Sequence, residues 1–172
     1  MVVRHNEIVD AVLARHADAL GESADTYRNH ALRSLNYQAL LLGHDVSDQA
    51  ALAWAVHDLG IWTAGTFDYL DPSATLAEQH AAELGIDRPE RAVEMVLEHH
   101  KLRPHPHGET ETFRRADLVD VSRGLIRLGI PRGEVKDVVR ALPYRGFHRF
   151  LAKGLTGHAV RHPGRPAPML RW

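Results

Sequence analysis

Two adjacent residues, His57 and Asp58, place an imidazole beside a carboxylate at the end of an apolar helical run and just before Gly60. Successive residues of an α-helix point in different directions, so this pair shares a target only where the helix is ending or where something holds the two together. A divalent metal ion is the natural candidate, because neutral imidazole nitrogen and ionised carboxylate oxygen both suit such ions. The dipeptide alone is a weak signal, and the prediction depends on what the rest of the chain supplies.

Further histidines and an aspartate fall within or at the ends of the other expected helices. The chain has 13 histidines in 172 residues, which makes a nitrogen-rich site plausible. Taken singly, a helical histidine is typical of a surface position or of a satisfied core position. Taken jointly, five successive expected helices each offer a nitrogen or oxygen ligand, and these ligands are His30, His57, Asp58, His80, His99, His100 and Asp117.

The elements that must position these residues are all helices. No segment alternates between apolar and polar residues as a strand would, and helical spacing with turn signals predicts about seven helices. Their expected ranges are 6–20, 23–42, 49–59, 72–84, 90–101, 112–128 and 131–142. Residues 60–71 are expected to form a loop that lines a site, and glycines and prolines from Gly154 onward predict an irregular tail that docks on the body.

Composition limits the class of protein. The length fits one all-α domain, 1–172, with a core at about 25–125 and a C-terminal helix and docked tail at 126–172. A formal charge of −1 gives no pull toward a nucleic-acid polymer, and no apolar run is long enough to span a bilayer. Without cysteine there is no disulfide or thiolate site. We expect a cytoplasmic protein, and nothing in the sequence supports an oligomer.

The order of a histidine, a His-Asp pair and a distal aspartate resembles the HD-domain superfamily of metal-dependent hydrolases. The matching residues are Asn29, His30 and Arg33, then the run 56–60, then the run 115–120, so the resemblance covers roughly residues 25–125. It implies a helical bundle in which one metal ion is bound by His30, His57, Asp58 and Asp117.

Some HD proteins add two histidines and hold two ions bridged by the aspartate of the pair. By this resemblance His80 and His99 would complete a two-metal site here, with Asp58 as the bridge. His100 is the alternative to His99. We favour His99, because His99 falls one turn after Val96 and so lies nearer the apolar face of its helix. Two divalent ions are therefore expected, and the sequence does not distinguish Fe, Mn, Co, Ni and Zn.

The expected chemistry is hydrolysis of a small anionic substrate, a phosphate ester or nucleotide. A divalent ion lowers the pKa of a bound water toward about 7 and neutralises charge on a phosphoryl oxygen. Arg114 lies one turn before Asp117, and Arg33 lies one turn after His30, so each shares a helix face with a ligand. We assign a catalytic role to Asp58, Lys101 and Arg114, and substrate binding to Arg33, Trp62, Lys101, Arg103 and Arg114.

Other functions stay open because the sequence departs from the commonest hydrolase pattern. Many HD hydrolases have a lysine in a His-Asp-x-Gly-Lys run, where this chain has Ile61. The alternatives are a mixed-valence di-iron oxygenase and a zinc-dependent hydratase of a nitrile-like molecule, with a non-enzymatic binding module as the last. Leu20 and Ser23 stand where phosphonate-oxidising members have tyrosine and glutamate, whereas 29–33 and 65–68 look similar to the hydratase group.

Overall fold

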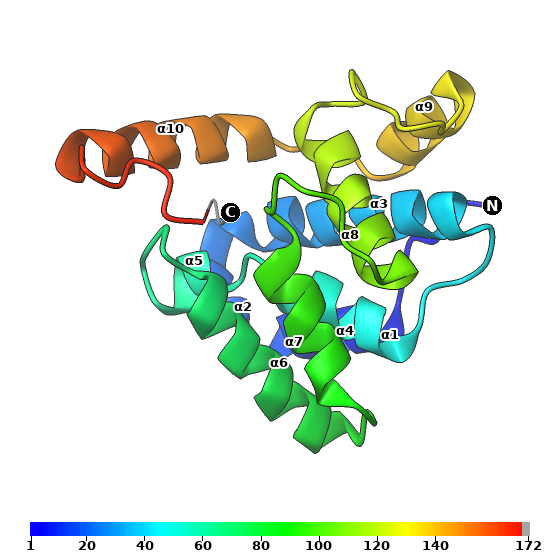
Figure 1. Cartoon of the computed structure of the whole chain (residues 1–172), viewed down its shortest axis with the longest axis horizontal. Helices are drawn as coiled ribbons and strands as arrows, with labels where there is room; N and C mark the ends of the chain where they lie inside the picture. Colours follow the sequence, from blue (N-terminus) through cyan, green and yellow to red (C-terminus); the bar gives the residue numbers. More distant parts are fainter. Residues whose placement is uncertain (170–172) are drawn as a thin grey trace.

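The computed structural model describes residues 1–169, and in that range the chain is helical without a β-strand (Figure 1). Eight helices in this range have nine residues or more, against about seven expected. They are α1 (Glu7–Arg15), α3 (Ala24–Leu42), α4 (Asp48–Val56), α6 (Leu70–Leu84), α7 (Pro89–Glu98), α8 (Gly108–Val121), α9 (Arg132–Ala141) and α10 (Phe147–Arg161). Two short helices, α2 (Ala17–Leu20) and α5 (Gly60–Thr63), and a 3-10 turn (Gly21–Ser23) complete the set. None of these described helices is both long and apolar enough to cross a membrane.

The core lies between the long helix α3 and the short helix α4. Helix α3 packs against α8 and α4, and α4 in turn packs against α1, α6 and α7 (Figure 1). Every residue of α4 from Gln49 to Val56 is buried, as expected for a helix that is apolar on all sides. Ser47 begins it, because its hydroxyl accepts from the backbone N–H of Ala50 at 3.1 Å. The most deeply buried helix therefore ends directly before His57.

The segment after the His-Asp pair is more ordered than the predicted loop. Residues 60–63 form α5, and α6 begins at Leu70, so the prediction of a loop over 60–71 is wrong at both ends. Pro72 is tolerated in the first turn of α6 because the N–H groups there have no helical partner to lose. A Cβ at Gly60 would lie 2.7 Å from the Tyr69 carbonyl oxygen, so only glycine lets α5 approach α6 this closely.

Of the other helix boundaries, two differ most from the sequence prediction. Helix α8 ends at Val121 rather than near residue 128, because Arg123 and Gly124 adopt positive φ angles of 57° and 72°. The Gly124 N–H then donates to the carbonyl of Val119 at 2.8 Å, which closes the helix end. The expected helix 6–20 is interrupted at His16, which separates α1 from α2.

The C-terminal segment is the largest correction. A tail too broken for a long helix was expected from Gly154, yet α10 runs through Gly154 and Gly157 to Arg161. Apolar packing outweighs the helix cost of glycine, which is about 1 kcal/mol per residue, because Phe150, Leu151 and Leu155 pack on a second cluster of buried residues. Residues 162–169 then return toward α5, and Met169 is buried (Figure 1). Residues 170–172, predicted to dock with the tail, lie outside the described residues.

Candidate metal centre

Three structural elements bring four of the predicted ligands into one buried cluster. His30 comes from α3, His57 and Asp58 from the turn after α4, and Asp117 from α8. The Nε2 atoms of His30 and His57 are 2.9 Å apart, and the Asp58 Oδ2 atom lies 3.6 and 3.4 Å from them. The Asp117 Oδ1 atom lies 3.6 Å from His30 Nε2. All four side chains are at most 5% exposed, so these nitrogen and oxygen atoms gather at one point that is shielded from bulk water.

A second group of ligands shares Asp58 with the first. His99 and His100 follow the end of α7, and His99 Nε2 lies 3.6 Å from Asp58 Oδ1. Asp58, His99 and His100 are close enough for one ion, as are His30, His57 and Asp58. His99 and His100 therefore lie in the same group instead of excluding each other, and Asp58 occupies the position expected of a bridging carboxylate.

Two of the imidazole rings are oriented by the same kind of hydrogen bond, made to a backbone carbonyl at the end of a helix. His57 and His99 are the C-cap residues of α4 and α7. Each Nδ1–H donates to the carbonyl three residues earlier, at 3.1 Å to Trp54 and at 2.7 Å to Val96. These carbonyls lack a helical partner at the helix end. Because Nδ1 holds the proton in both rings, the Nε2 lone pairs are directed at Asp58, as in metal sites oriented by a second layer of contacts.

His30 is oriented by a carboxylate. Its Nδ1–H donates to Asp120 Oδ2 at 2.7 Å, and Asp120 also accepts from Arg33 Nε at 2.6 Å and from Arg33 Nη2 at 2.8 Å. Arg33 is fully buried and also donates to the carbonyls of Leu142 and Pro143. The prediction that Arg33 binds substrate is therefore corrected, because its guanidinium is occupied within the core and acts on the cluster through Asp120.

Two atoms of the cluster lack the partners that buried polar atoms normally have. Asp58 Oδ1 and His99 Nε2 are both buried without a hydrogen-bond partner. Such atoms cost free energy unless something satisfies them. A cation between them would satisfy both, because one is a carboxylate oxygen and the other carries a ring lone pair. The donor set thus fits a divalent ion.

The charges around the cluster also fit a cation. Burial alone would lower the pKa of His30, but the contacts with Asp120 and Asp58 outweigh it and raise that pKa to about 9. Burial raises the pKa of Asp117 to about 6, opposed by His30 and His99. Burial lowers the pKa of His57 to about 3, so this ring is neutral near pH 7 and keeps its lone pair. The three carboxylates around His30 therefore favour positive charge at this point.

His80 does not join either ligand group. Its Nε2 atom lies 2.7 Å from His16 Nε2, and its Nδ1 atom contacts Glu83 at 3.0 Å. Within residues 1–169 the groups able to hold an ion contain His99 and His100 but not His80. The expectation that His80 completes the second ion site is therefore replaced by the pair His99 and His100.

Replacing these histidines one at a time separates the two assignments. We expect His99→Ala to lower the affinity for the second ion at least tenfold, because the loss of an outer-shell partner already costs about 10–100-fold. His80→Ala should leave the metal content unchanged, because its partners are His16 and Glu83. Elemental analysis after equilibration with Mn²⁺ or Zn²⁺ measures both. Loss of an ion from His80→Ala with none from His99→Ala would reverse this assignment.

Lys101 and Arg114, two of the predicted substrate-binding cations, are held by acidic neighbours. Lys101 Nζ contacts Glu98 at 2.6 Å, and Arg114 binds Glu111 through two bonds of 2.8 and 2.9 Å. Arg103 is exposed beside the loop after α7. Trp62 stacks on Phe150 of α10 with ring centroids 4.9 Å apart, so it belongs to the contact between α5 and α10.

A small cavity of about 210 Å³ opens onto the cluster. Asp58, Asp117, His100 and Tyr69 form its polar end. The remaining lining is apolar and comes from the loop before α6, from α8, from α10 and from the returning C-terminal segment: Phe67, Val121, Leu151, Leu155, Ala167 and Met169. In the part of the chain that the structure describes, no lysine or arginine lines it.

Two buried tyrosines line or support the site; Tyr69 falls in the segment 60–71 that was expected to line a site, whereas Tyr27 was not predicted. The Tyr69 hydroxyl lies 2.7 Å from His100 Nε2 at the polar end of the cavity. The Tyr27 hydroxyl donates to the carbonyl of Ala55 at 3.1 Å and accepts from the N–H of Asp58 at 3.2 Å. Tyr27 therefore fixes the backbone turn that presents Asp58. The sequence offered one signal for Tyr27: it lies one helical turn before His30 and so shares a face of α3 with this predicted ligand.

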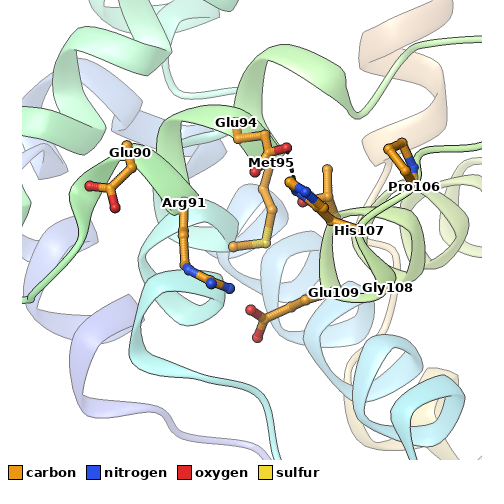
Figure 2. A pocket seen from close by; sticks show the side chains of 9 residues that line it. Glu90, Arg91, Glu94, Met95, Pro106, His107, Gly108 and Glu109 are labelled. Atoms are coloured by element: carbon orange, nitrogen blue, oxygen red, sulfur yellow. Dashed lines mark hydrogen bonds and ion pairs between the residues drawn. The ribbon is translucent and has the colours of Figure 1, made fainter.

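A third group on the surface is a weaker candidate for metal binding. Glu94 Oε1 lies 2.8 Å from His107 Nδ1 and 3.2 Å from His105 Nε2, at the rim of an open depression (Figure 2). The backbone N–H of His107 donates to His105 Nδ1 at 3.2 Å. The ring proton of His105 is therefore on Nε2, the atom that lies 3.2 Å from Glu94, and the ring has no lone pair left for an ion. The Glu94 group is therefore held by hydrogen bonds at the surface, whereas the cluster at Asp58 contains buried polar atoms that have no partner.

Comparison with known proteins adds no identity to this geometry. The chain matches no known protein family, no curated protein and no solved structure. The residues of the cluster and of the cavity must therefore carry the functional argument.

Proposed function

We propose that the chain is a metal-dependent hydrolase of the HD type that acts on a small molecule. One observation carries the proposal: the Nε2 atoms of three oriented histidines face the carboxylate of Asp58 beside a cavity, and His99 Nε2 and Asp58 Oδ1 have no partner. Nitrogen and carboxylate donors of this kind suit Zn, Mn, Fe, Co and Ni. The order of these residues in the chain supports the HD type.

The ligands divide between two ions. His30, His57, Asp58 and Asp117 would hold one, and Asp58 with His99 and His100 would hold the other. When bound, a divalent ion lowers the pKa of a water molecule and neutralises negative charge that develops on the substrate. Asp120, Trp54 and Val96 keep the three rings in the tautomer that this role requires.

Tyr69 and His100 form a hydrogen-bonded pair at the cavity wall. The Tyr69 hydroxyl and His100 Nε2 are 2.7 Å apart, and both residues line the cavity beside Asp58. Burial raises the pKa of Tyr69 well above its usual value, so the hydroxyl keeps its proton near pH 7 and can form a hydrogen bond with a polar group at this end of the cavity. The apolar remainder of the lining keeps bulk water away from that end.

The cavity supports a small substrate better than a nucleotide. Ligand pockets for drug-sized molecules measure about 300–1,000 Å³, whereas this cavity measures about 210 Å³. Two of the cations expected to bind substrate, Lys101 and Arg114, are paired with Glu98 and Glu111. A small ester, amide, nitrile or phosphate ester therefore remains in the proposal, and a whole nucleotide does not.

A di-iron oxygenase is the second candidate, favoured by the position of Asp58. This carboxylate belongs to both ligand groups, as a bridge between two irons would. Oxygenation and hydrolysis differ in their need for dioxygen, so a single assay distinguishes them.

Turnover by the metal-loaded chain under nitrogen tests the proposal. We expect protein loaded with Mn²⁺, Co²⁺, Zn²⁺ or Fe²⁺ to hydrolyse at least one of a small phosphate ester, carboxylic ester, amide or nitrile without oxygen. Chromatography measures the product, and the metal-free chain is the control. Turnover that requires oxygen, together with two irons and a mixed-valence EPR signal, would support the oxygenase instead. A chain that takes up no ion would contradict both functions.

A further inference from the structure

The cavity beside the cluster has one polar end and an apolar body. Its polar groups are all on the side of Asp58, Asp117, His100 and Tyr69. The opposite walls consist of hydrocarbon side chains from α8, α10 and the returning segment. A ligand that matches both parts has one polar group on a hydrocarbon ring or short chain.

The size of the cavity limits that hydrocarbon part. A cavity of about 150 Å³ lined by aliphatic and aromatic side chains is enough to hold benzene. The volume here, about 210 Å³, therefore accommodates one six-membered ring or a comparable chain with a small polar substituent. The lining from described residues contains no cation, so it offers no partner for a second, charged substituent.

Helix α10 and Phe67 meet at a glycine next to this cavity. A Cβ built on Gly154 would overlap the Phe67 ring, so this ring occupies the space that the side chain of any other amino acid at position 154 would need. Phe67 also lines the cavity, as do Leu151 and Leu155 on either side of Gly154. Any residue larger than glycine at position 154 must displace the Phe67 ring and so change the cavity.

We propose that this cavity binds the hydrocarbon part of a small substrate whose single polar group faces Asp58 and Tyr69. Gly154 and Phe67 determine the size of that part. The identification of the ligand as a substrate rests on the proposed hydrolase function, but the binding itself does not need turnover.

Binding of 4-fluorobenzamide, a neutral ring with one polar group, tests this proposal by ¹⁹F NMR. We expect saturable binding to the metal-loaded chain and at least fivefold weaker binding to Gly154→Ala. Gly157→Ala is the matched control on the same helix, because a Cβ there meets only the end of Arg161 at 3.3 Å; its affinity should stay within twofold. Both changes favour the helix, since alanine is a better helix former than glycine by about 1 kcal/mol.

A second variant tests the role of Phe67 directly. The double change Phe67→Ala with Gly154→Ala should restore the affinity lost in Gly154→Ala, because it removes the ring that alanine displaces. Failure of the chain to bind the probe, or equal affinity of Gly154→Ala and the original chain, would overturn the proposal. Metal content is measured in every sample. A chain that binds the probe but neither holds an ion nor hydrolyses any ester or amide would refute the hydrolase function and leave the cavity assignment intact.

Discussion

Asp58→Asn should abolish metal binding while the protein stays folded. Asp58 is the one carboxylate that belongs to both ligand groups, and its Oδ1 atom has no hydrogen-bond partner to lose. Asparagine keeps the size of the side chain and removes its charge. We expect affinity for both ions to fall more than about 100-fold, because even outer-shell partners contribute 10–100-fold.

Metal content after dialysis measures the effect, and near-UV circular dichroism confirms the fold. Asp48→Asn is the matched control, because Asp48 is an exposed carboxylate on the helix that leads to the pair. It should bind as many ions as the original chain. Stoichiometric metal in Asp58→Asn would show that the cluster at Asp58 is not the metal centre.

Asp120→Asn should cause the largest loss of stability. Asp120 and Arg33 are both fully buried and joined by bonds of 2.6 and 2.8 Å. Burial alone would raise the pKa of Asp120, but the bonds from Arg33 and His30 outweigh it and lower that pKa to about 2. Removing one partner of a buried ion pair leaves the other charge uncompensated and costs about 3–5 kcal/mol. A domain has only about 5–15 kcal/mol of unfolding free energy, so this change removes a large share of it.

Urea unfolding of the metal-free protein measures that loss. Asp137→Asn is the control, because its pair with Arg140 is 55% and 77% exposed and should contribute less than about 1 kcal/mol. The double change Arg33→Met with Asp120→Leu should recover stability, because apolar residues can replace a buried pair. It should still bind metal more weakly, since His30 Nδ1 loses its acceptor. If Asp120→Asn were as stable toward urea as Asp137→Asn, the buried pair of Asp120 and Arg33 would not contribute the stability that we assign to it.

The sequence predicted which residues gather in the cluster better than it predicted the residues that orient them. His30, His57, Asp58, His99 and Asp117 were assigned from their order in the chain, and the structure brings all five together. The helix end at the His-Asp pair was also predicted. His80 was assigned by order as well, but it lies against His16, which the order of ligands did not involve.

The supporting contacts left little trace in the sequence. Two of the three imidazole rings are oriented by backbone carbonyls, which every residue possesses. Arg33 shares a helix face with His30, but spacing could not show that Asp120 of another helix would neutralise it. Helix α10 was missed because its stability comes from distant contacts such as Phe67 against Gly154, which outweigh the local preference of glycine.

The first residue of α10 stacks on a histidine ring of the cluster at Asp58. Phe147 stacks on His30 with centroids 4.0 Å apart and planes 19° apart. The helix that Phe147 begins carries Leu151 and Leu155, which form a wall of the cavity. An ion held by the His30 ring would therefore be linked to this wall through Phe147. Such a linkage is reciprocal: a ligand against the wall would change the affinity for the ion by the same free energy as the ion changes the affinity for the ligand.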